Sequence, residues 1–466
     1  MKQMVLALLF IAVFTASASS GGPRRHVAAE FAQSKATPSV APNVSRMEQV
    51  VESFVANKQF MGTVLVAHGD DVLLDKGYGL ADIEWDVPDS PKTKFRLGSI
   101  TKQFTAASIL LLQERGKLSV HDPVKKYMPD APAAWDKITI FNLLTHTSGI
   151  PNFTSFPSYR SLEPFPQTPE QLVALFKDKP LDFQPGESWS YSNSGYVLLG
   201  YLIEKISGEG YAQFVQENIF KPLGMEDSGY DSNSAVIKDR ASGYAPSPKG
   251  FVNAGYIDMT IPFSAGALYS TTGDLFCWER GLFGGKLLSP ASLKEMTTPF
   301  KNDYAFGLGV RTMNGHEVIS HNGGIEGFNT SMAYYPQDKV TVIALANVNG
   351  SAPDEIANDL GVLALGGNIV LPSERKEVHV DPKIFDGYLG TYQLAPNFSL
   401  TVTREGDHLF LQPTGQSRSE LFAESAKDYF LKTVDAQITF VTDSQGRATE
   451  LILHQGGADN HAKRIE

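Results

Sequence analysis

Cysteine is nearly absent from this chain: Cys277 is the only one in 466 residues. A single cysteine excludes an internal disulfide, so the folded protein must be stable without one. Cys277 lies in DLFCWERGLF, an apolar pattern typical of a helix packed on a core. We therefore expect a buried structural thiol here rather than a nucleophile.

Lysine and arginine are also fewer than aspartate and glutamate. Lys and Arg total 40 against 51 Asp and Glu, giving a formal net charge of -11 at pH 7. A protein that binds nucleic acid needs clustered Lys and Arg to neutralise phosphates. The excess of acidic residues therefore argues against a nucleic-acid partner. A net negative charge also keeps proteins soluble.

Several catalytic signatures are missing as well. The closest approach to G-x-S-x-G is Gly186–Ser190, which lacks the last glycine, so an α/β-hydrolase nucleophile elbow is disfavoured. His316–Ser320 lacks the second histidine of H-E-x-x-H, and no other histidine cluster has metal-ligand spacing. We expect neither a metal nor a cofactor.

Only one long apolar run occurs, at the N-terminus. Lys2 precedes MVLALLFIAVFTA, and Ala16–Ala18 then provides an A-x-A cleavage site. This run is short for a bilayer, and no other segment approaches about 18 uninterrupted apolar residues. We predict a signal peptide over residues 1–18, a periplasmic or secreted protein, and no stable membrane span after cleavage. An uncleaved N-terminal anchor is the alternative.

The length suffices for two or three domains. Residues 19–43 are small, polar and Pro-containing, which indicates a flexible leader. In 44–367, strand patterns at both ends enclose a helical middle, favouring one antiparallel sheet covered by helices. Residues 368–383 have the composition of a linker. In 384–466, short β-rich runs alternate with turns, as in a small sandwich or barrel.

Individual elements of the larger domain can also be predicted. We expect a helix from about Met47 to Lys58 and a hairpin around His68–Asp71. A second helix should run over Ser99–Arg115 and stop at Gly116. Residues 335–338 should turn between two strands.

The stretch FRLGSITKQFT opens the second helix with two chemically useful side chains. Ser99 and Lys102 are three residues apart, so they share a helix face and can meet. A serine hydroxyl needs a base, and desolvation can lower the pKa of a lysine enough to serve. Alternatively Ser99 is a plain N-cap and Lys102 points to water. A second S-x-x-K, Ser373–Lys376, lies among charges and should be solvated surface.

Two further patterns could supply the rest of a site. In Tyr191–Asn193, the chain's one Y-x-N, a phenol could shuttle protons and an amide could hold a substrate carbonyl. His321–Gly324 lies between two predicted strands, where glycines let a substrate backbone approach. The alternatives are a loop tyrosine with a turn asparagine, and an Asn-Gly hairpin turn.

Taken in order, S-x-x-K at Ser99, Y-x-N at Tyr191 and H-x-G at His321 resemble the penicillin-binding-protein and class C β-lactamase superfamily of serine hydrolases. LLTHTSGIP, SAGALYSTTGDLFCW and HNGGIEGFNTSMAYYP extend the resemblance over roughly residues 45–365. It implies an α/β fold of the β-lactamase/transpeptidase type: an antiparallel sheet flanked by helices, plus a helical subdomain. Related proteins with C-terminal extensions imply a lipocalin-like β-barrel for residues 384–466.

The resemblance also implies residue roles. Ser99 is the acylated nucleophile, and Lys102 and Tyr191 exchange protons with it and with the leaving group. The backbone N–H groups of Ser99 and Gly324 form the oxyanion hole. Substrate binding falls to Asn193, His321, Gly323 and Gly324.

The sequence departs from the family pattern at one residue, and one loop allows two interpretations. His321 stands where many members carry a lysine whose charge helps hold a substrate carboxylate. A histidine supplies that charge only when protonated, which disfavours a β-lactamase proper. The resemblance further makes LLTHTSGIP a structural loop bordering the site rather than a His146–Ser148 catalytic pair.

The sequence thus predicts an exported serine hydrolase that cleaves an amide or ester bond. D,D-carboxypeptidases, D-aminopeptidases and family VIII esterases are the relatives it resembles most. A β-lactamase proper is one alternative, and a catalytically inactive binding protein is another. The expected partner is a small-molecule or peptide substrate, and the oligomeric state is left open.

Overall fold

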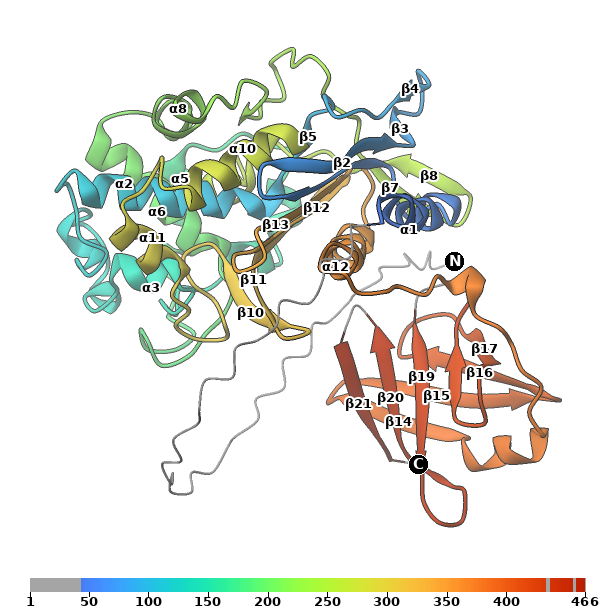
Figure 1. Cartoon of the computed structure of the whole chain (residues 1–466). Helices are drawn as coiled ribbons and strands as arrows, with labels where there is room; N and C mark the ends of the chain where they lie inside the picture. The colour runs from blue at the N-terminus through green and yellow to red at the C-terminus, as the bar shows by residue number, and fades with distance from the viewer. Residues whose placement is uncertain (1–42, 433–435, 456–457, 466) are drawn as a thin grey trace, which may run out of the picture. The chain divides into compact units, whose positions relative to one another are not determined.

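The computed structural model describes residues 43–432, 436–455 and 458–465. Packing divides these residues into two compact units, one of 44–365 and one that begins at Gly366 (Figure 1). The segments predicted as signal peptide and leader lie outside the described residues, apart from Asn43. None of the helices in the described residues is long and apolar enough to cross a membrane.

A six-stranded antiparallel sheet runs through the larger unit. Two neighbouring inner strands come from opposite ends of the unit, with Val64 opposite Ala344, which confirms the predicted sheet. Both strands are buried along almost their whole length, so their β-branched side chains pack on both faces. The strand order is β10 (Gly309–Met313), β11 (His316–Ile325), β12 (Phe328–Tyr335), β13 (Val340–Ala346), β1 (Gly62–His68) and β2 (Asp71–Tyr78).

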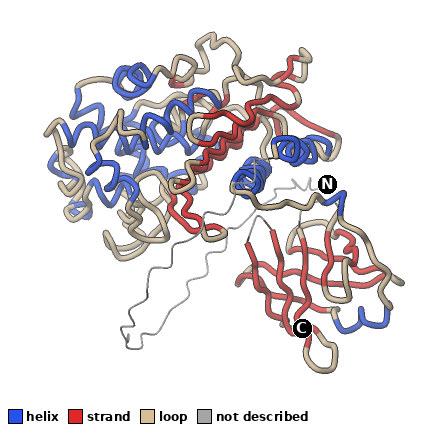
Figure 2. Tube along the Cα trace, in the orientation of Figure 1, coloured by secondary structure: helices blue, strands red, loops and turns tan. Residues whose placement is uncertain are grey.

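Helices cover both faces of this sheet, as predicted (Figures 1 and 2). On one face lie α1 (Val44–Ala56) and α12 (Ala352–Ala364), which also contact each other. On the other face α10 (Thr272–Phe283) packs against β1 and β13. The apolar residues of α1 recur at helical spacing and form one buried stripe: Met47, Val50, Val51 and Phe54.

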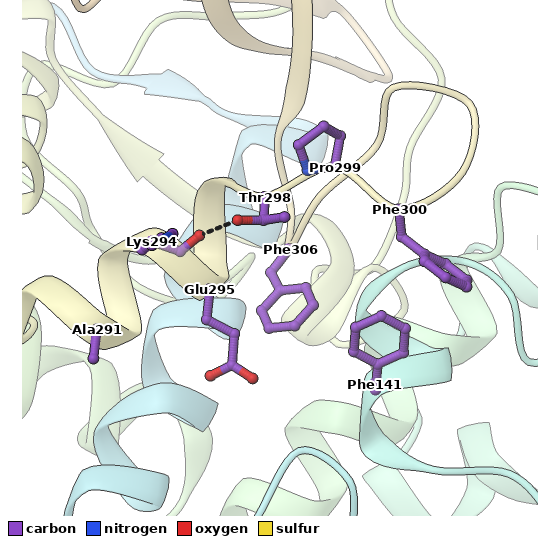
Figure 3. A pocket seen from close by; sticks show the side chains of 8 residues that line it. All are labelled: Phe141, Ala291, Lys294, Glu295, Thr298, Pro299, Phe300 and Phe306. Carbon is purple, nitrogen blue, oxygen red and sulfur yellow. Dashed lines mark hydrogen bonds between the residues drawn. The ribbon is translucent and has the colours of Figure 1, made fainter.

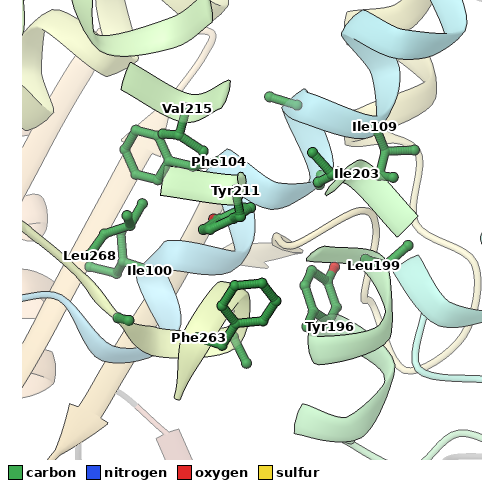
Figure 4. Packing of buried hydrophobic residues seen from close by; sticks show 14 of the residues in the cluster. Ile100, Phe104, Ile109, Tyr196, Leu199, Ile203, Tyr211, Val215, Phe263 and Leu268 are labelled. Atoms are coloured by element: carbon green, nitrogen blue, oxygen red, sulfur yellow. The ribbon is translucent and has the colours of Figure 1, made fainter. Parts of the chain in front are cut away.

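The helical part of the unit is organised around α2 (Thr101–Glu114), which is buried from Thr101 to Leu112. It packs against α6 (Asn193–Ser207) and α9 (Phe263–Gly266). Figure 4 shows this core, where Phe104 of α2 lies among side chains from several helices. The remaining helices are α3 (Ile140–Leu144), α4 (Tyr159–Leu162), α5 (Pro169–Lys177), α7 (Tyr211–Val215), α8 (Lys221–Leu223) and α11 (Pro290–Thr297).

Short strands complete the larger unit. The most important for the site are β5 (Phe95–Arg96) and β9 (Leu268–Ser270), which pair antiparallel just before Ser99. The others are β3 (Leu80–Asp82), β4 (Val87–Pro88), β6 (Gly229–Tyr230), β7 (Tyr244–Ser247) and β8 (Gly250–Asn253).

The smaller unit contains a closed eight-stranded antiparallel barrel, which confirms the predicted barrel-like domain. Apolar side chains fill its interior, where the rings of Tyr388 and Phe440 stack at 4.3 Å. Eight strands enclose a space that side chains can just fill. The strands are β14 (Gly390–Ala395), β15 (Phe398–Glu405), β16 (His408–Pro413), β17 (Ser419–Ala423), β18 (Asp428–Phe430), β19 (Gln437–Thr442), β20 (Ala448–Gln455) and β21 (Ala458–Arg464).

Two expectations about individual residues were wrong. Cys277 is exposed, because α10 turns Leu275, Trp278 and Leu282 inward and leaves the thiol on its outer face. His321–Gly324 does not separate two strands but lies within the second half of β11. The second S-x-x-K was interpreted correctly, since Ser373 and Lys376 are both exposed.

Candidate active site

The segment that leads to Ser99 is held on both sides by strands. The Leu97 N–H donates to the Leu268 carbonyl at 2.8 Å, which continues the pairing of β5 with β9. The Thr330 hydroxyl of β12 donates to the Leu97 carbonyl, also at 2.8 Å. The chain then enters a 3₁₀ turn over Gly98–Ile100 and continues as α2. Ser99 therefore lies at a helix start, where the sheet meets the helices.

Lys102 is fully buried and makes three hydrogen bonds. Its Nζ lies 3.0 Å from the Ser99 Oγ, 2.9 Å from the Asn193 Oδ1 and 2.8 Å from the Ala265 carbonyl oxygen. Burial holds the pKa of the Lys102 amine well below its ordinary value. The alternative of a solvated lysine is therefore wrong, as is that of a capping serine, because the Ser99 side chain caps neither the turn nor α2.

The hydrogen-bond acceptors around Lys102 determine where the lone pair of its neutral amine points. The oxygens of Asn193 and Ala265 can only accept, so they take both N–H groups of a neutral amine. The lone pair of that amine then faces the Ser99 hydroxyl. The arrangement is that of a general base against a serine nucleophile.

Tyr191 is partly buried and borders the same pair. Its phenol lies beside Ser99, and Lys102 Nζ lies 4.9 Å from the centre of its ring. Burial raises the pKa of Tyr191, so the resting group is a phenol rather than a phenolate. A phenol beside Ser99 can relay a proton, but it cannot act as the base that first deprotonates the serine.

Asn193 is the first residue of α6 and is oriented by two residues of one loop. Its backbone N–H donates to the Asn152 Oδ1 at 3.1 Å, and its Nδ2 donates to the Thr154 Oγ1 at 3.2 Å. These bonds direct its Oδ1 towards Lys102. Neither loop residue was predicted to belong to the site, and no sequence pattern marks them.

The glycines of β11 accommodate the protein's own backbone. A Cβ on Gly323 would lie 1.9 Å from the Leu97 carbonyl oxygen, and one on Gly98, whose φ is 54°, would lie 2.8 Å from the Gly324 nitrogen. From the sequence we expected the glycines of β11 to admit a substrate backbone. The structure shows that they also let the Ser99 segment lie directly on the strand.

We expect Gly323→Ala to destabilise the enzyme and to lower its activity. The new methyl group would lie too close to both the Leu97 carbonyl oxygen and the Thr330 hydroxyl, which is 2.4 Å away, so the strand or the Ser99 segment must move. Overpacking of this kind costs about 1–3 kcal/mol or more. Urea unfolding and kcat of the variant check this. Gly315→Ala is the control for adding a methyl group, since nothing lies within 4 Å of its Cβ position, although its positive φ costs some stability.

His321 has both ring nitrogens engaged within the protein. Its Nδ1 lies 2.6 Å from the Asn322 carbonyl oxygen, and its Nε2 lies 3.0 Å from the Tyr304 hydroxyl. Burial and the nearby Lys102 lower the pKa of His321 to about 4. Tyr304 was not singled out in the sequence, because no motif relates it to H-x-G.

His146 and Ser148 do not form a pair. The His146 Nδ1 accepts from the Ser192 N–H at 3.1 Å, while the Ser148 Oγ accepts from the Ile150 N–H at 3.2 Å. The His146 imidazole lies 4.4 Å from the Tyr191 ring, centre to centre, so its loop borders the site. Three more aromatic rings surround it, those of Trp189, Tyr196 and Tyr304.

The segment that carries Tyr304 also lines an apolar pocket of about 330 Å³ (Figure 3). Phe300 and Phe306 face Phe141 edge-on, with ring centres 5.0 and 5.6 Å apart. None of the predicted site residues lines this pocket, so we place the site at Ser99. The lining residues are Phe141, Ala291, Lys294, Glu295, Thr298, Pro299, Phe300 and Phe306.

Comparison with known families matches both units. The profile of the family described as Beta-lactamase covers residues 47–366, and that of a domain of unknown function, DUF3471, covers residues 374–464. Penicillin-binding protein 4* of Bacillus subtilis is 30% identical over 456 residues, which is 90% of this chain and 98% of that protein.

Solved structures agree with this comparison. The octameric penicillin-binding protein homologue from Pyrococcus abyssi is 27% identical, with a TM-score of 0.65 over 90% of this chain and 100% of that one. A D-stereospecific amidohydrolase from Streptomyces is 30% identical, with a TM-score of 0.58 over 66% of this chain and 95% of that one.

Proposed function

Because the chain belongs to the Beta-lactamase family and is a serine hydrolase, we propose that it is exported and cleaves an amide or ester bond through an acyl-Ser99 intermediate. The observation that carries the proposal is the bonding of Lys102. Two acceptors take its N–H groups and leave its lone pair to the serine hydroxyl.

The first half of the reaction acylates the enzyme. Lys102 removes the Ser99 proton as the Oγ forms a bond to the substrate carbonyl carbon, and the carbonyl π electrons move to its oxygen. The backbone N–H groups of Ser99 and Gly324 hold that oxyanion. The intermediate then expels the amine or alkoxide, which takes the proton from Lys102 by way of the Tyr191 hydroxyl.

The second half releases the acid. A water molecule attacks the acyl carbon and gives a proton to Lys102 along the same path. The bond from carbon to the Ser99 Oγ breaks, and Ser99 recovers its proton. In this scheme Asn193 orients Lys102 and the substrate carbonyl. Gly323 and His321 border the part of the substrate-binding space that lies beside β11.

We place the substrate among amides or esters of D-amino-acid-containing compounds. The full-length similarity to a penicillin-binding protein and the similarity to a D-stereospecific amidohydrolase support this class. The N-terminal sequence supports export, and cleavage after Ala18 predicts a secreted or periplasmic protein that begins at Ser19. The N-terminal sequence of protein recovered from outside the cytoplasm tests this.

A catalytically inactive binding protein fits the geometry poorly. Burying a lysine amine disfavours its charged form and costs free energy, and a binding module gains nothing from the loss of that charge. A β-lactamase proper is disfavoured because His321 provides no fixed cation.

Covalent labelling tests the proposal. We expect a fluorophosphonate to add once to the wild-type protein, with the adduct mapped to Ser99 by mass spectrometry, because the probe needs an activated serine. A fluorescent penicillin should label the same residue if the site accepts β-lactams. The Ser148→Ala variant is the matched control and should be labelled as wild type. An adduct elsewhere, or none on folded protein, would exclude the acyl-Ser99 mechanism.

A further inference from the structure

We propose that Tyr304 is a positioning residue that keeps His321 in one neutral tautomer, so that the enzyme prefers substrates with a neutral group, rather than a carboxylate, beside β11. The substrate preference rests on the proposed function. The positioning role rests on the hydrogen bonds of the two side chains.

Those bonds determine where the protons are. The Asn322 carbonyl oxygen can only accept, so the His321 Nδ1, 2.6 Å away, must carry a proton. In a neutral imidazole the Nε2 is then an acceptor, and the Tyr304 hydroxyl, 3.0 Å away, is its donor. Both ring nitrogens are satisfied within the protein, and the ring has no N–H left for a substrate.

The position of Tyr304 is itself fixed by the backbone around it. Its N–H donates to the Lys301 carbonyl at 3.1 Å, and its carbonyl accepts from the Phe300 N–H at 3.0 Å. The following residue, Ala305, donates to the Leu308 carbonyl at 2.8 Å. Tyr304 is only 7% exposed, so its hydroxyl is held against His321 rather than moving in solvent.

The surroundings of His321 oppose its protonation. The imidazole is 8% exposed, and the rings of Tyr191 and Tyr304 lie 6.3 and 5.8 Å from it. Lys102 on α2 acts on it when protonated, and His146 is the other imidazole nearby. A positive charge on either neighbour repels a second one on His321. Geometry and charge thus favour the same neutral form.

A neutral His321 changes which substrates fit. A carboxylate beside β11 would lose water and gain no cation from this residue, which is costly in a buried site. An amide or ester at the same place carries no charge to desolvate. The site should therefore discriminate against a free carboxylate on the leaving group.

Two thioesters with the same acyl group test the preference, one releasing mercaptoacetamide and the other mercaptoacetate. We expect wild type to favour the amide by about tenfold or more in kcat/KM. Tyr304→Phe removes the donor and leaves Nε2 free to take a proton, so the preference should shrink, most at low pH. His321→Lys should reverse it by supplying a cation. Tyr211→Phe, which removes a buried hydroxyl bonded to Thr105, should leave it unchanged.

Nitrogen NMR of protein with labelled histidine reports the tautomer independently of activity. The His321 signals, identified by their loss in His321→Asn, should show a proton on Nδ1 and none on Nε2, and Tyr304→Phe should raise the pKa of His321. A proton on Nε2, or no response to Tyr304→Phe, would overturn the positioning role.

The kinetic outcomes separate the two proposals. Preference of wild type for the mercaptoacetate thioester would overturn the substrate inference while leaving acyl-Ser99 chemistry intact. Loss of all thioester turnover with no fluorophosphonate adduct would overturn the proposed function, and the substrate preference with it. The NMR signals would then decide the role of Tyr304 alone.

Discussion

Ser99→Ala should lower kcat by about four orders of magnitude or more while leaving the fold intact. Removing the nucleophile of a serine hydrolase leaves only the catalysis that an oxyanion hole and substrate binding provide. Alanine loses one hydroxyl and fits without strain, because the Ser99 side chain caps no helix. The effect should therefore fall on turnover rather than on folding.

The measurement is kcat on a thioester or amide, together with urea unfolding of the same preparation. Ser108→Ala, which removes a buried hydroxyl that donates to the Phe104 carbonyl on α2, is the control for losing a serine from this helix. It should keep its turnover and lose some stability. If Ser99→Ala retained turnover within about tenfold of wild type, another nucleophile would have to be sought.

The sheet and the barrel could be predicted because their patterns are local. GTVLVAH and VTVIALA are continuous β-rich runs, and two buried runs of this kind at either end of a helical segment favour pairing with each other. In the C-terminal unit, turns such as Glu405–Asp407 separate short strands at regular spacing. Such patterns can be recognised without knowledge of tertiary contacts.

The errors arose where a local signal has two structural meanings. Asn322–Gly323 is a common hairpin turn, yet here β11 continues through it because β12 pairs with it as far as Ile325. Cys277 lies in an apolar helix, but the rotation that buries Trp278 and Leu282 turns the thiol outward. Periodicity gives the buried face of a helix less reliably when apolar residues adjoin each other.

The residues that complete the site could not be found from motifs. Ala265 contributes a backbone carbonyl, and any residue type could do so. Tyr304 reaches His321 from a segment between α11 and β10, and the sequence gives no spacing that relates the two. S-x-x-K identified the reacting pair, whereas the groups that set its protonation lie far away in the chain.

Lys102→Met should lower kcat by about 10²–10⁴-fold, the usual contribution of a general base. Methionine fills similar space but has no lone pair, so the Ser99 hydroxyl loses its base. In wild type, kcat/KM should rise with pH as Lys102 gives up its proton, and the variant should lack this rise. Lys126→Met is the control, because Lys126 lies at the surface beside Asp122 and its loss should not change the profile.

Stability supplies a second readout of the same ionisation. A lysine whose pKa is lowered on folding binds fewer protons in the folded state, so it makes the protein more stable as the pH rises from the folded pKa towards about 10.4. In that window wild type should gain up to about 1.4 kcal/mol per pH unit relative to Lys102→Met. Urea unfolding of both proteins between about pH 7 and 10 measures this difference. A constant difference would mean that Lys102 stays protonated in the folded enzyme, and Ser99 would then need another base.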